Sequence, residues 1–358
     1  MLRPIREITG PALGDPGPRE SACSAVPGSR RVRSSRSSSF LRKRYWWHKQ
    51  RKAGLREWEI PASAAGLIGM VVWGSLAVGT TKLDAGRSTM CRMLGVICND
   101  EDLLGCAVHQ VRDALRCPEA TRHDGIGIGY YSGDEPLLKK RPSSEGEKIE
   151  YTELLKGIRS KVVLVHVRQA TVGSWKDRNT HPFRFRKWLF AHIGHLPALQ
   201  DNRQKLLERI PEFLSRNVRG DTDSELAFHL FLEVLFKEGK LNELDMPAEK
   251  LGEFLRQLAV EVNGLHEGPE KPKMAVIITN GRIMAALSQG VSIHYSFREG
   301  ILDCNVHEPT QQNKQTHALF RGIMIGAAMD APGHQWREIP DGSIIHVSNM
   351  LEMKVEHL

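Results

Sequence analysis

The sequence contains few cysteines, and their spacing argues against two kinds of site. Six cysteines are scattered through 358 residues, and no two of them form a CxxC pair. No spacing matches a zinc site, and a set this sparse in a chain of this length is typical of reduced thiols. We therefore expect a cytoplasmic protein with no bound metal.

Long hydrophobic runs are also lacking. The candidate segment, Ala64 to Gly79, is apolar but rich in glycine, and it is shorter than the roughly 20 residues that a membrane-spanning helix needs. It begins too far from Met1, and follows too long a basic stretch, to be a secretory signal. A membrane anchor is therefore the less favoured interpretation of this segment.

The formal net charge of +8 comes from the first quarter of the chain. Residues 1–89 hold 16 Lys and Arg against 6 Asp and Glu, whereas the remaining residues hold 34 against 36. The Ser- and Arg-rich stretch from Ser29 to Lys52 lacks apolar periodicity and cannot bury enough surface to offset chain entropy. We expect residues 1–89 to be a basic disordered extension, or the result of a start codon assigned too far upstream.

Nucleic-acid binding through residues 29–52 is an alternative that rests on this charge alone. We expect no nucleic-acid partner.

From Met90 onward the pattern is that of a folded domain, residues 90–358. Short apolar runs predict strands, and helical spacing predicts helices within 103–116, 223–237 and 248–262. The predicted strands are 91–98, 126–131, 161–168, 188–194, 274–279, 282–287, 301–304 and 343–348. Strands on both sides of a helical middle argue against a doubly wound sheet and predict an α+β fold with two sheets between helices. TNGR, from Thr279 to Arg282, predicts a hairpin.

Five short segments carry the candidate chemistry. They are Met90-Cys91, HDGIGIGYY from His123, HVRQAT from His166, NTHPF to WLFAHIG between Asn179 and Gly194, and GDTDSE from Gly220. Each is weak alone, but together and in this order they resemble class II glutamine amidotransferases, in particular the small members that are little more than a glutaminase domain. The resemblance extends from Met90 to roughly Val347. It implies a four-layer α/β/β/α sandwich of the N-terminal-nucleophile hydrolase type.

Cys91 is the residue that the resemblance assigns as nucleophile. In this family the free α-amine of the same residue serves as the base, and the usual pKa of such an amine, roughly 7.7–8.0, suits proton transfer near neutrality. As the chain is printed, that nitrogen lies in a peptide bond, so the mechanism requires a start at Met90 or cleavage before Cys91. The alternative is an ordinary buried cysteine on a strand.

Arg168, Thr171 and Asp223 match the positions that hold the head group of glutamine. A guanidinium binds a carboxylate through two parallel hydrogen bonds, and Asp223 would bind the α-ammonium group. Thr171 would shape the same pocket. The alternatives are a solvated Arg168 at a strand end and helix capping by Asp221, Thr222 or Asp223.

Gly194 matches the glycine whose backbone N–H helps to hold the oxyanion. The family's FAHNG is FAHIG in this sequence, so Ile193 replaces an asparagine that donates from its side chain. Activity is then reduced, or another group compensates, or the protein binds without turnover. We expect His192 and His195 to be surface imidazoles, with His195 the less favoured choice of a substitute donor.

The glycines of HDGIGIGYY do not form a GxGxxG motif, so we expect a closely packed core strand rather than a dinucleotide loop. Asn179, His181 and Pro182 match a structural loop beside the glutamine pocket, and the segment from Ala328 to Ile345 matches the family's closing strand.

The predicted function is hydrolysis of glutamine or of a γ-glutamyl bond in a small molecule, without metal or organic cofactor. A separate synthetase that accepts the ammonia is a partner that the sequence neither supports nor excludes. The alternative is a non-catalytic γ-glutamyl-binding or regulatory module.

Overall fold

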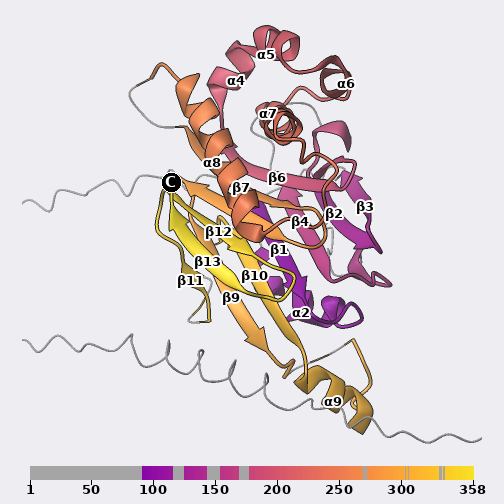
Figure 1. The fold of residues 1–358 in the computed structure, drawn as a ribbon. Coiled ribbons are helices and arrows are strands. Elements are labelled where there is room, and N and C mark those ends of the chain that lie inside the picture. Colours follow the sequence, from indigo (N-terminus) through magenta and orange to yellow (C-terminus); the bar gives the residue numbers. More distant parts are fainter. Residues whose placement is uncertain are drawn as a thin grey trace, which may run out of the picture. The chain divides into compact units, whose positions relative to one another are not determined.

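The structure is a computed structural model, and it describes residues 91–115, 125–142, 154–168, 177–268, 272–302, 304, 306–329, 333 and 335–358 (Figure 1). Our expectations for residues 1–89 and for Ala64 to Gly79 lie outside these ranges. Within them, no helix is both long and apolar enough to cross a membrane.

Two antiparallel sheets form the centre of the fold. The seven-stranded sheet has the strand order β11-β9-β10-β1-β4-β2-β3. Its strands are β1 (Arg92–Cys98), β2 (Gly125–Ser132), β3 (Glu135–Pro142), β4 (Val162–Arg168), β9 (Ile293–Glu299), β10 (Arg321–Ala327) and β11 (Arg337–Glu338). β1 lies near the middle of this sheet and pairs with β10 on one side and β4 on the other.

The second sheet has six strands in the order β13-β12-β8-β7-β6-β5. Its strands are β5 (Phe183–Phe185), β6 (Trp188–His195), β7 (Lys273–Thr279), β8 (Met284–Gln289), β12 (Ser343–Val347) and β13 (Met353–His357). The helices are α2 (Leu104–Gln110), α4 (Pro197–Asp201), α5 (Arg203–Arg209), α6 (Glu212–Ser215), α7 (Asp223–Lys237), α8 (Ala248–Gly264) and α9 (Gln311–Ala318), with 3-10 turns at Arg112–Leu115 and Asp177–Asn179.

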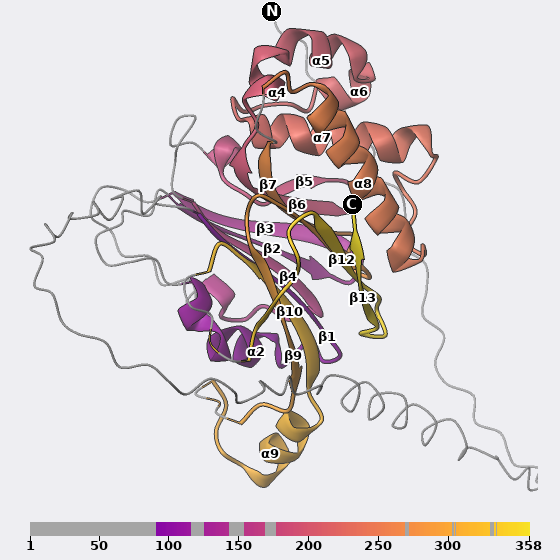
Figure 2. The same ribbon diagram turned by 90° about the vertical axis from the view of Figure 1, so that its left-hand side faces the viewer.

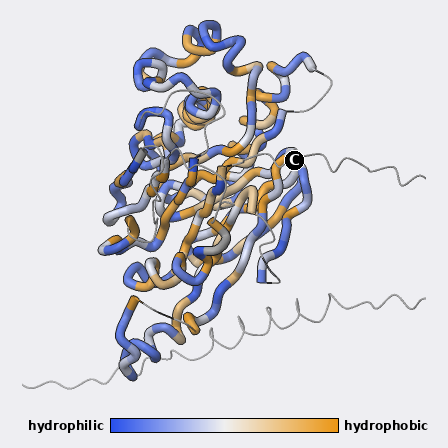
Figure 3. The backbone as a smooth tube through the Cα atoms, turned by 180° about the vertical axis from the view of Figure 1, so that it is seen from behind, coloured by the Kyte–Doolittle hydropathy of each residue, from blue (hydrophilic) through white to orange (hydrophobic). Residues whose placement is uncertain are grey.

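Three apolar cores explain this arrangement. One core lies between the sheets and takes alternate residues of their strands, such as Met93 of β1 and Leu189 of β6. The second lies between α7, α8 and the outer face of the six-stranded sheet, and the third lies between α2 and the outer face of the seven-stranded sheet (Figure 2). The central strands are therefore apolar on both faces, which Figure 3 shows as hydrophobic colour along the strands.

The α+β class and most of the predicted elements are confirmed. The helix expected at 103–116 is shorter, because α2 ends at Gln110 and a 3-10 turn follows. The strand expected at 301–304 is wrong. β9 ends at Glu299, Gly300 adopts φ +74°, and Ile301 packs in the core beside α2 as part of a loop.

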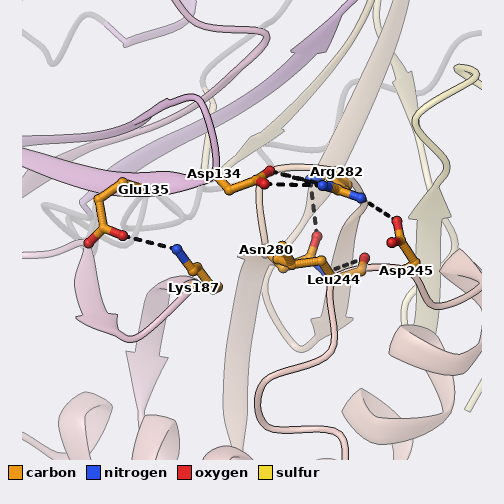
Figure 4. A network of polar contacts seen from close by, with 7 residues as sticks. All are labelled: Asp134, Glu135, Lys187, Leu244, Asp245, Asn280 and Arg282. Carbon is orange, nitrogen blue, oxygen red and sulfur yellow. Dashed lines mark hydrogen bonds and ion pairs between the residues drawn. The ribbon is translucent and has the colours of Figure 1, made fainter.

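The TNGR turn joins β7 to β8 as predicted, and its arginine also ties the turn to two other segments (Figure 4). Arg282 pairs with Asp134, between β2 and β3, at 3.1 Å, and also with Asp245 in the α7–α8 connection. The amide of Asn280 donates to the carbonyl of Leu244 at 3.1 Å. The turn therefore ties the middle of the six-stranded sheet to the β2–β3 connection and to the α7–α8 connection.

Gly127 of β2 lies under the chain that leads into β5. A Cβ atom at this position would lie 1.8 Å from the carbonyl oxygen of His181. The expectation that the GIGIG glycines permit close packing is therefore confirmed at this position. The clashing atom belongs to the backbone, which cannot move aside as the end of a flexible side chain can. Adding a methyl group here therefore forces the two chain segments to rearrange.

We expect Gly127→Ala to lower the free energy of unfolding by about 3 kcal/mol or more, because overpacking against backbone is costly. The matched control is Gly264→Ala at the end of α8, where an added Cβ meets nothing within 4 Å. That variant should stay within roughly 1 kcal/mol of the wild type. Urea unfolding at unchanged m-value measures both, and equal midpoints would contradict the packing argument.

Candidate active site

Cys91 and Arg168 lie at neighbouring strand ends in the seven-stranded sheet. β1 and β4 are antiparallel, with Arg92 across from Val167, so continuing the register places Cys91 across from Arg168. Residues that face each other on paired strands have Cα atoms about 4.5–5.5 Å apart. The half-buried Cys91 packs against the core between the sheets. The predicted nucleophile and the predicted carboxylate-binding residue are therefore close together.

Arg168 is 4% exposed, which excludes the solvated arginine that we considered as an alternative. Its strand has alternate residues in the two cores: Val165 and Val167 face α2, whereas Leu164 faces the other sheet. Arg168 has the same parity as Leu164 and so points toward the space between the sheets.

Asp223 connects the end of β6 with the start of α7. Its Oδ2 accepts a hydrogen bond of 2.7 Å from the backbone N–H of Leu196, and its Oδ1 accepts one of 2.8 Å from Ser224 N–H. The carboxylate is 7% exposed. These bonds hold the helix start against the strand that carries Gly194.

The N-terminal cap of α7 is formed mainly by Thr222 and Glu225. The N-cap is Thr222, whose side chain accepts from the N–H of Glu225. The Glu225 carboxylate in turn accepts from Arg219 and Gly220 N–H at 2.9 and 2.6 Å. The N-cap is therefore Thr222, while Asp223 accepts from the first-turn N–H of Ser224 and joins α7 to the end of β6.

Asn179 supports the same region from the loop before β5. It is fully buried, and its Oδ1 accepts a 3.0 Å hydrogen bond from Asp221 N–H. Asn179 therefore has a structural role, because it holds the turn that leads to Asp223.

Gly194 lies near the end of β6 at φ +147°, where an added Cβ would be 2.0 Å from the carbonyl oxygen of Lys273. The position therefore requires glycine, because the neighbouring strand β7 leaves no room for a side chain. Ile193 beside it is 4% exposed and belongs to the core between the sheets, the same core that Cys91 contacts. This apolar side chain stands at the position for which the sequence resemblance predicts a hydrogen-bond donor.

The two histidines beside Gly194 differ from each other. His195 is largely exposed, as expected, with its Nδ1 3.7 Å from Asp223 Oδ2. The expectation of a surface imidazole is wrong for His192, which is 2% exposed and has its Nδ1 2.8 Å from Ser224 Oγ. His192 contacts Ser224 of α7, which covers that face of β6, whereas His195 is the exposed last residue of the strand.

Thr171 lies outside the described residues. No sequence motif indicates the contact between Ser224 and His192 or the bond from Leu196 to Asp223. Both depend on how α7 packs against β6, and only the N-terminal capping pattern of α7 could have indicated that this helix start matters.

Buried histidines form a second feature of the site. The rings of His166 and His181 lie 4.3 Å apart, centroid to centroid. Burial, together with the positive charge of Arg168, lowers the pKa of His166 to about 3. Burial likewise lowers the pKa of His181 and of His192. These imidazoles are therefore neutral at physiological pH and leave Arg168 as a positive charge.

A pH dependence of stability follows. Between the usual histidine pKa and about pH 3, unfolded His166 binds a proton that the native residue does not bind, so this residue lowers stability as pH falls through that range. Its contribution is roughly 1.4 kcal/mol per pH unit. We expect His166→Gln, which cannot titrate, to flatten the fall in urea-unfolding free energy between pH 6 and 4. Parallel curves for both proteins would contradict the assignment.

The comparison with known proteins identifies the family of the chain. Residues 90–304 match the family of class II glutamine amidotransferases, and the chain belongs to that family. The chain is 34% identical over 248 residues to the probable glutamine amidotransferase DUG3 of Saccharomyces cerevisiae, which covers 63% of this chain and 69% of that protein. It is 27% identical over 216 residues to a putative glutamine amidotransferase of Haemophilus influenzae, covering 59% and 66%.

Among solved structures, a glutamine aminotransferase class-II domain protein of Silicibacter pomeroyi superposes with a TM-score of 0.49 at 16% identity. It covers 75% of this chain and 99% of that one.

Proposed function

We propose that the chain hydrolyses the side-chain amide of glutamine, or a γ-glutamyl bond in a small molecule, through Cys91 as an N-terminal thiolate. The observation that carries this proposal is the placement of Cys91 across from buried Arg168, at the edge of the core between the sheets. We also propose that the layers described above are the four-layer α/β/β/α sandwich of N-terminal-nucleophile hydrolases, formed by residues 90–358.

The reaction needs one base and one water molecule. The α-amine of Cys91 takes the thiol proton while Sγ attacks the amide carbon, and the resulting ammonium returns a proton to the departing nitrogen. Ammonia, or an amine from a γ-glutamyl compound, leaves a thioester on Cys91. Water then cleaves the thioester to release glutamate and restore the thiol. No metal or organic cofactor takes part in these steps.

A free α-amine at Cys91 requires that no residue precede it. The family match begins at residue 90, which supports a start at Met90 followed by removal of that methionine. Cleavage of a longer chain before Cys91 would give the same terminus.

Arg168 and Asp223 would select the two ends of an amino-acid head group. The guanidinium binds the α-carboxylate, and the Asp223 oxygens, already oriented by Leu196 and Ser224 N–H, accept from the α-ammonium group. Thr171 would complete this pocket. An arginine and an aspartate at opposite ends favour a zwitterion over a peptide side chain.

Gly194 would offer its backbone N–H to the oxyanion that forms on the amide oxygen. Loss of the neighbouring side-chain donor at Ile193 costs roughly 2.7–4 kcal/mol in transition-state stabilisation. We therefore propose slow turnover compared with relatives that have asparagine at this position.

We expect Arg168→Gln to raise KM for glutamine by roughly 30- to 150-fold, because about 2–3 kcal/mol of charge-assisted hydrogen bonding is lost. The matched control is Arg159→Gln, since Arg159 is exposed and pairs with Glu101 and Asp102 at the surface. That variant should change KM less than about twofold. A loss in kcat with unchanged KM at Arg168 would contradict the head-group role.

The proposal is tested by measuring glutamate and ammonia release from glutamine, and from γ-glutamyl dipeptides, with protein that begins at Cys91. Burial of Ile193 favours the second candidate, a γ-glutamyl-binding module without turnover. Calorimetric binding of glutamine without product release would support that module and contradict hydrolysis. If ammonia is released, adding candidate synthetases would show whether a separate partner consumes it.

A further inference from the structure

Four side chains that can bind a metal converge on the outer side of the seven-stranded sheet. One comes from α2, two from the connection between β9 and α9, and one from α9 itself. Their ligand atoms all lie within 4.8 Å of one another: Cys106, Cys304, His307 and His317. α2 and α9 lie at the same end of the sheet in both ribbon views (Figures 1 and 2).

Five distances between these atoms, from 3.1 to 3.7 Å, are close to the edges of a tetrahedron around one ion. Cys106 Sγ lies 3.1 Å from His307 Nδ1, 3.7 Å from His317 Nε2 and 3.3 Å from Cys304 Sγ. His307 Nδ1 lies 3.7 Å from Cys304 Sγ and 3.3 Å from His317 Nε2. Bond lengths of 2.3 Å to sulfur and 2.0–2.1 Å to nitrogen give ligand separations of about 3.3–3.8 Å in tetrahedral zinc.

A disulfide does not explain the cluster. The two sulfur atoms are 3.3 Å apart, whereas a disulfide bond is about 2.05 Å long. Cys106 and Cys304 are both free. Ordinary side-chain packing does not explain the cluster either, because its four ligand atoms face one point instead of separate hydrogen-bond partners.

We propose that this Cys2His2 cluster binds one Zn²⁺ ion. Two thiols each lose a proton to solvent as two neutral imidazoles and two thiolates take the ion, so the centre carries no net charge. This neutrality suits its location, since Cys106 is fully buried and His317 is 6% exposed. Two thiolates and two imidazoles in a tetrahedral arrangement favour zinc over magnesium or calcium.

The surroundings also fit a metal site. The N–H of His307 lies 3.3 Å from Cys304 Sγ and donates to it, which would stabilise a thiolate. Cys304, His307 and His317 line a cavity of about 470 Å³ that gives an ion a path from solvent. Cys106, the ligand from α2, is fully buried.

The geometry points to a structural role. All four positions are filled by protein ligands, which leaves none for a reacting water molecule. The site lies beyond Cys98, at the far end of the seven-residue strand β1 from Cys91, so roughly 20 Å separates the two sites. The ion would fasten the β9–α9 connection to α2, and this inference does not depend on the proposed hydrolysis.

The spacing of cysteines along the chain does not indicate this cluster, because its two cysteines are far apart in sequence. Cys106 is separated by 198 residues from Cys304. The remaining ligands follow as Cys304-x2-His307-x9-His317, which contains no CxxC pair.

The test measures metal in the full chain, purified without chelator, by inductively coupled plasma mass spectrometry. We expect about one zinc ion per chain. Replacing it with Co²⁺ should give the strong visible absorption of a tetrahedral ion together with thiolate-to-cobalt charge transfer. Cys304→Ser and His317→Ala should each reduce zinc content at least about tenfold.

The matched control is Cys98→Ser, whose thiol lies outside the cluster and bonds to the carbonyl of Asp100. It should keep its zinc. Wild-type protein that contains no zinc and fails to bind added Zn²⁺ or Co²⁺ overturns the proposal whether or not the variants fold. So does a cobalt spectrum without thiolate bands, a Cys106–Cys304 disulfide in mass spectra, or full zinc retention in both cluster variants.

Discussion

Cys91→Ala, in protein that begins at residue 91, is expected to lower glutaminase turnover by about 10⁴-fold or more, because the covalent route is lost with its nucleophile. Glutamine binding should persist, since Arg168 and Asp223 remain. The measurement is ammonia release under saturating glutamine, with binding followed separately by calorimetry.

The matched control uses the other cysteine of the same strand. Burial raises the pKa of the Cys98 thiol to about 12, so this sulfur stays protonated and is a poor nucleophile. Cys98→Ser should keep turnover within a few-fold of the wild type. Equal background rates for wild type and Cys91→Ala would show that the chain binds without hydrolysis, as the alternative module would.

Retaining the upstream residues is expected to have the second large effect. Protein whose intact mass includes residues 1–90 should turn over glutamine roughly 10²–10⁴-fold more slowly than protein beginning at Cys91, because general-base catalysis contributes that much. The amine of Cys91 is then an amide nitrogen and cannot accept a proton.

Both proteins should be assayed with their termini confirmed by mass spectrometry before and after the reaction. Thermal unfolding serves as the control, because the two should share a folded domain. If the longer protein is as fast while its mass is unchanged, another base must act on the thiol. N-terminal sequencing of protein from its natural source then decides which form exists there.

Local sequence patterns predicted several elements, although the buried apolar strand β10 was not among them. The continuous apolar runs of β1 and β4 follow from burial on both faces, and the capped start of α7 follows from Thr222 and Glu225. β9 escaped prediction because it carries polar residues such as His294 and Arg298 among its apolar ones. The false strand at 301–304 is a short apolar run that the outer core buries as a loop.

In the candidate site, too, some residues could be predicted from local sequence and others could not. Cys91, Arg168 and Gly194 lie within contiguous motifs, so a resemblance in sequence could indicate them. The bond from Leu196 to Asp223 joins residues 27 positions apart, and its existence depends on the packing of α7 against β6. The buried state of His192 has the same cause, because a strand end gives no indication of which helix covers it.

The central position of β1 has one more consequence for Cys91. Chain ends usually fray because only one side of them is held. Here the first residues of β1 lie in the interior of the sheet, where the strand pairs with β10 on one side and with β4 on the other. A chain cut just before Cys91 would therefore have its new end held by strand pairing on both sides. Amide hydrogen exchange should then be slow from the first residue of β1 onward.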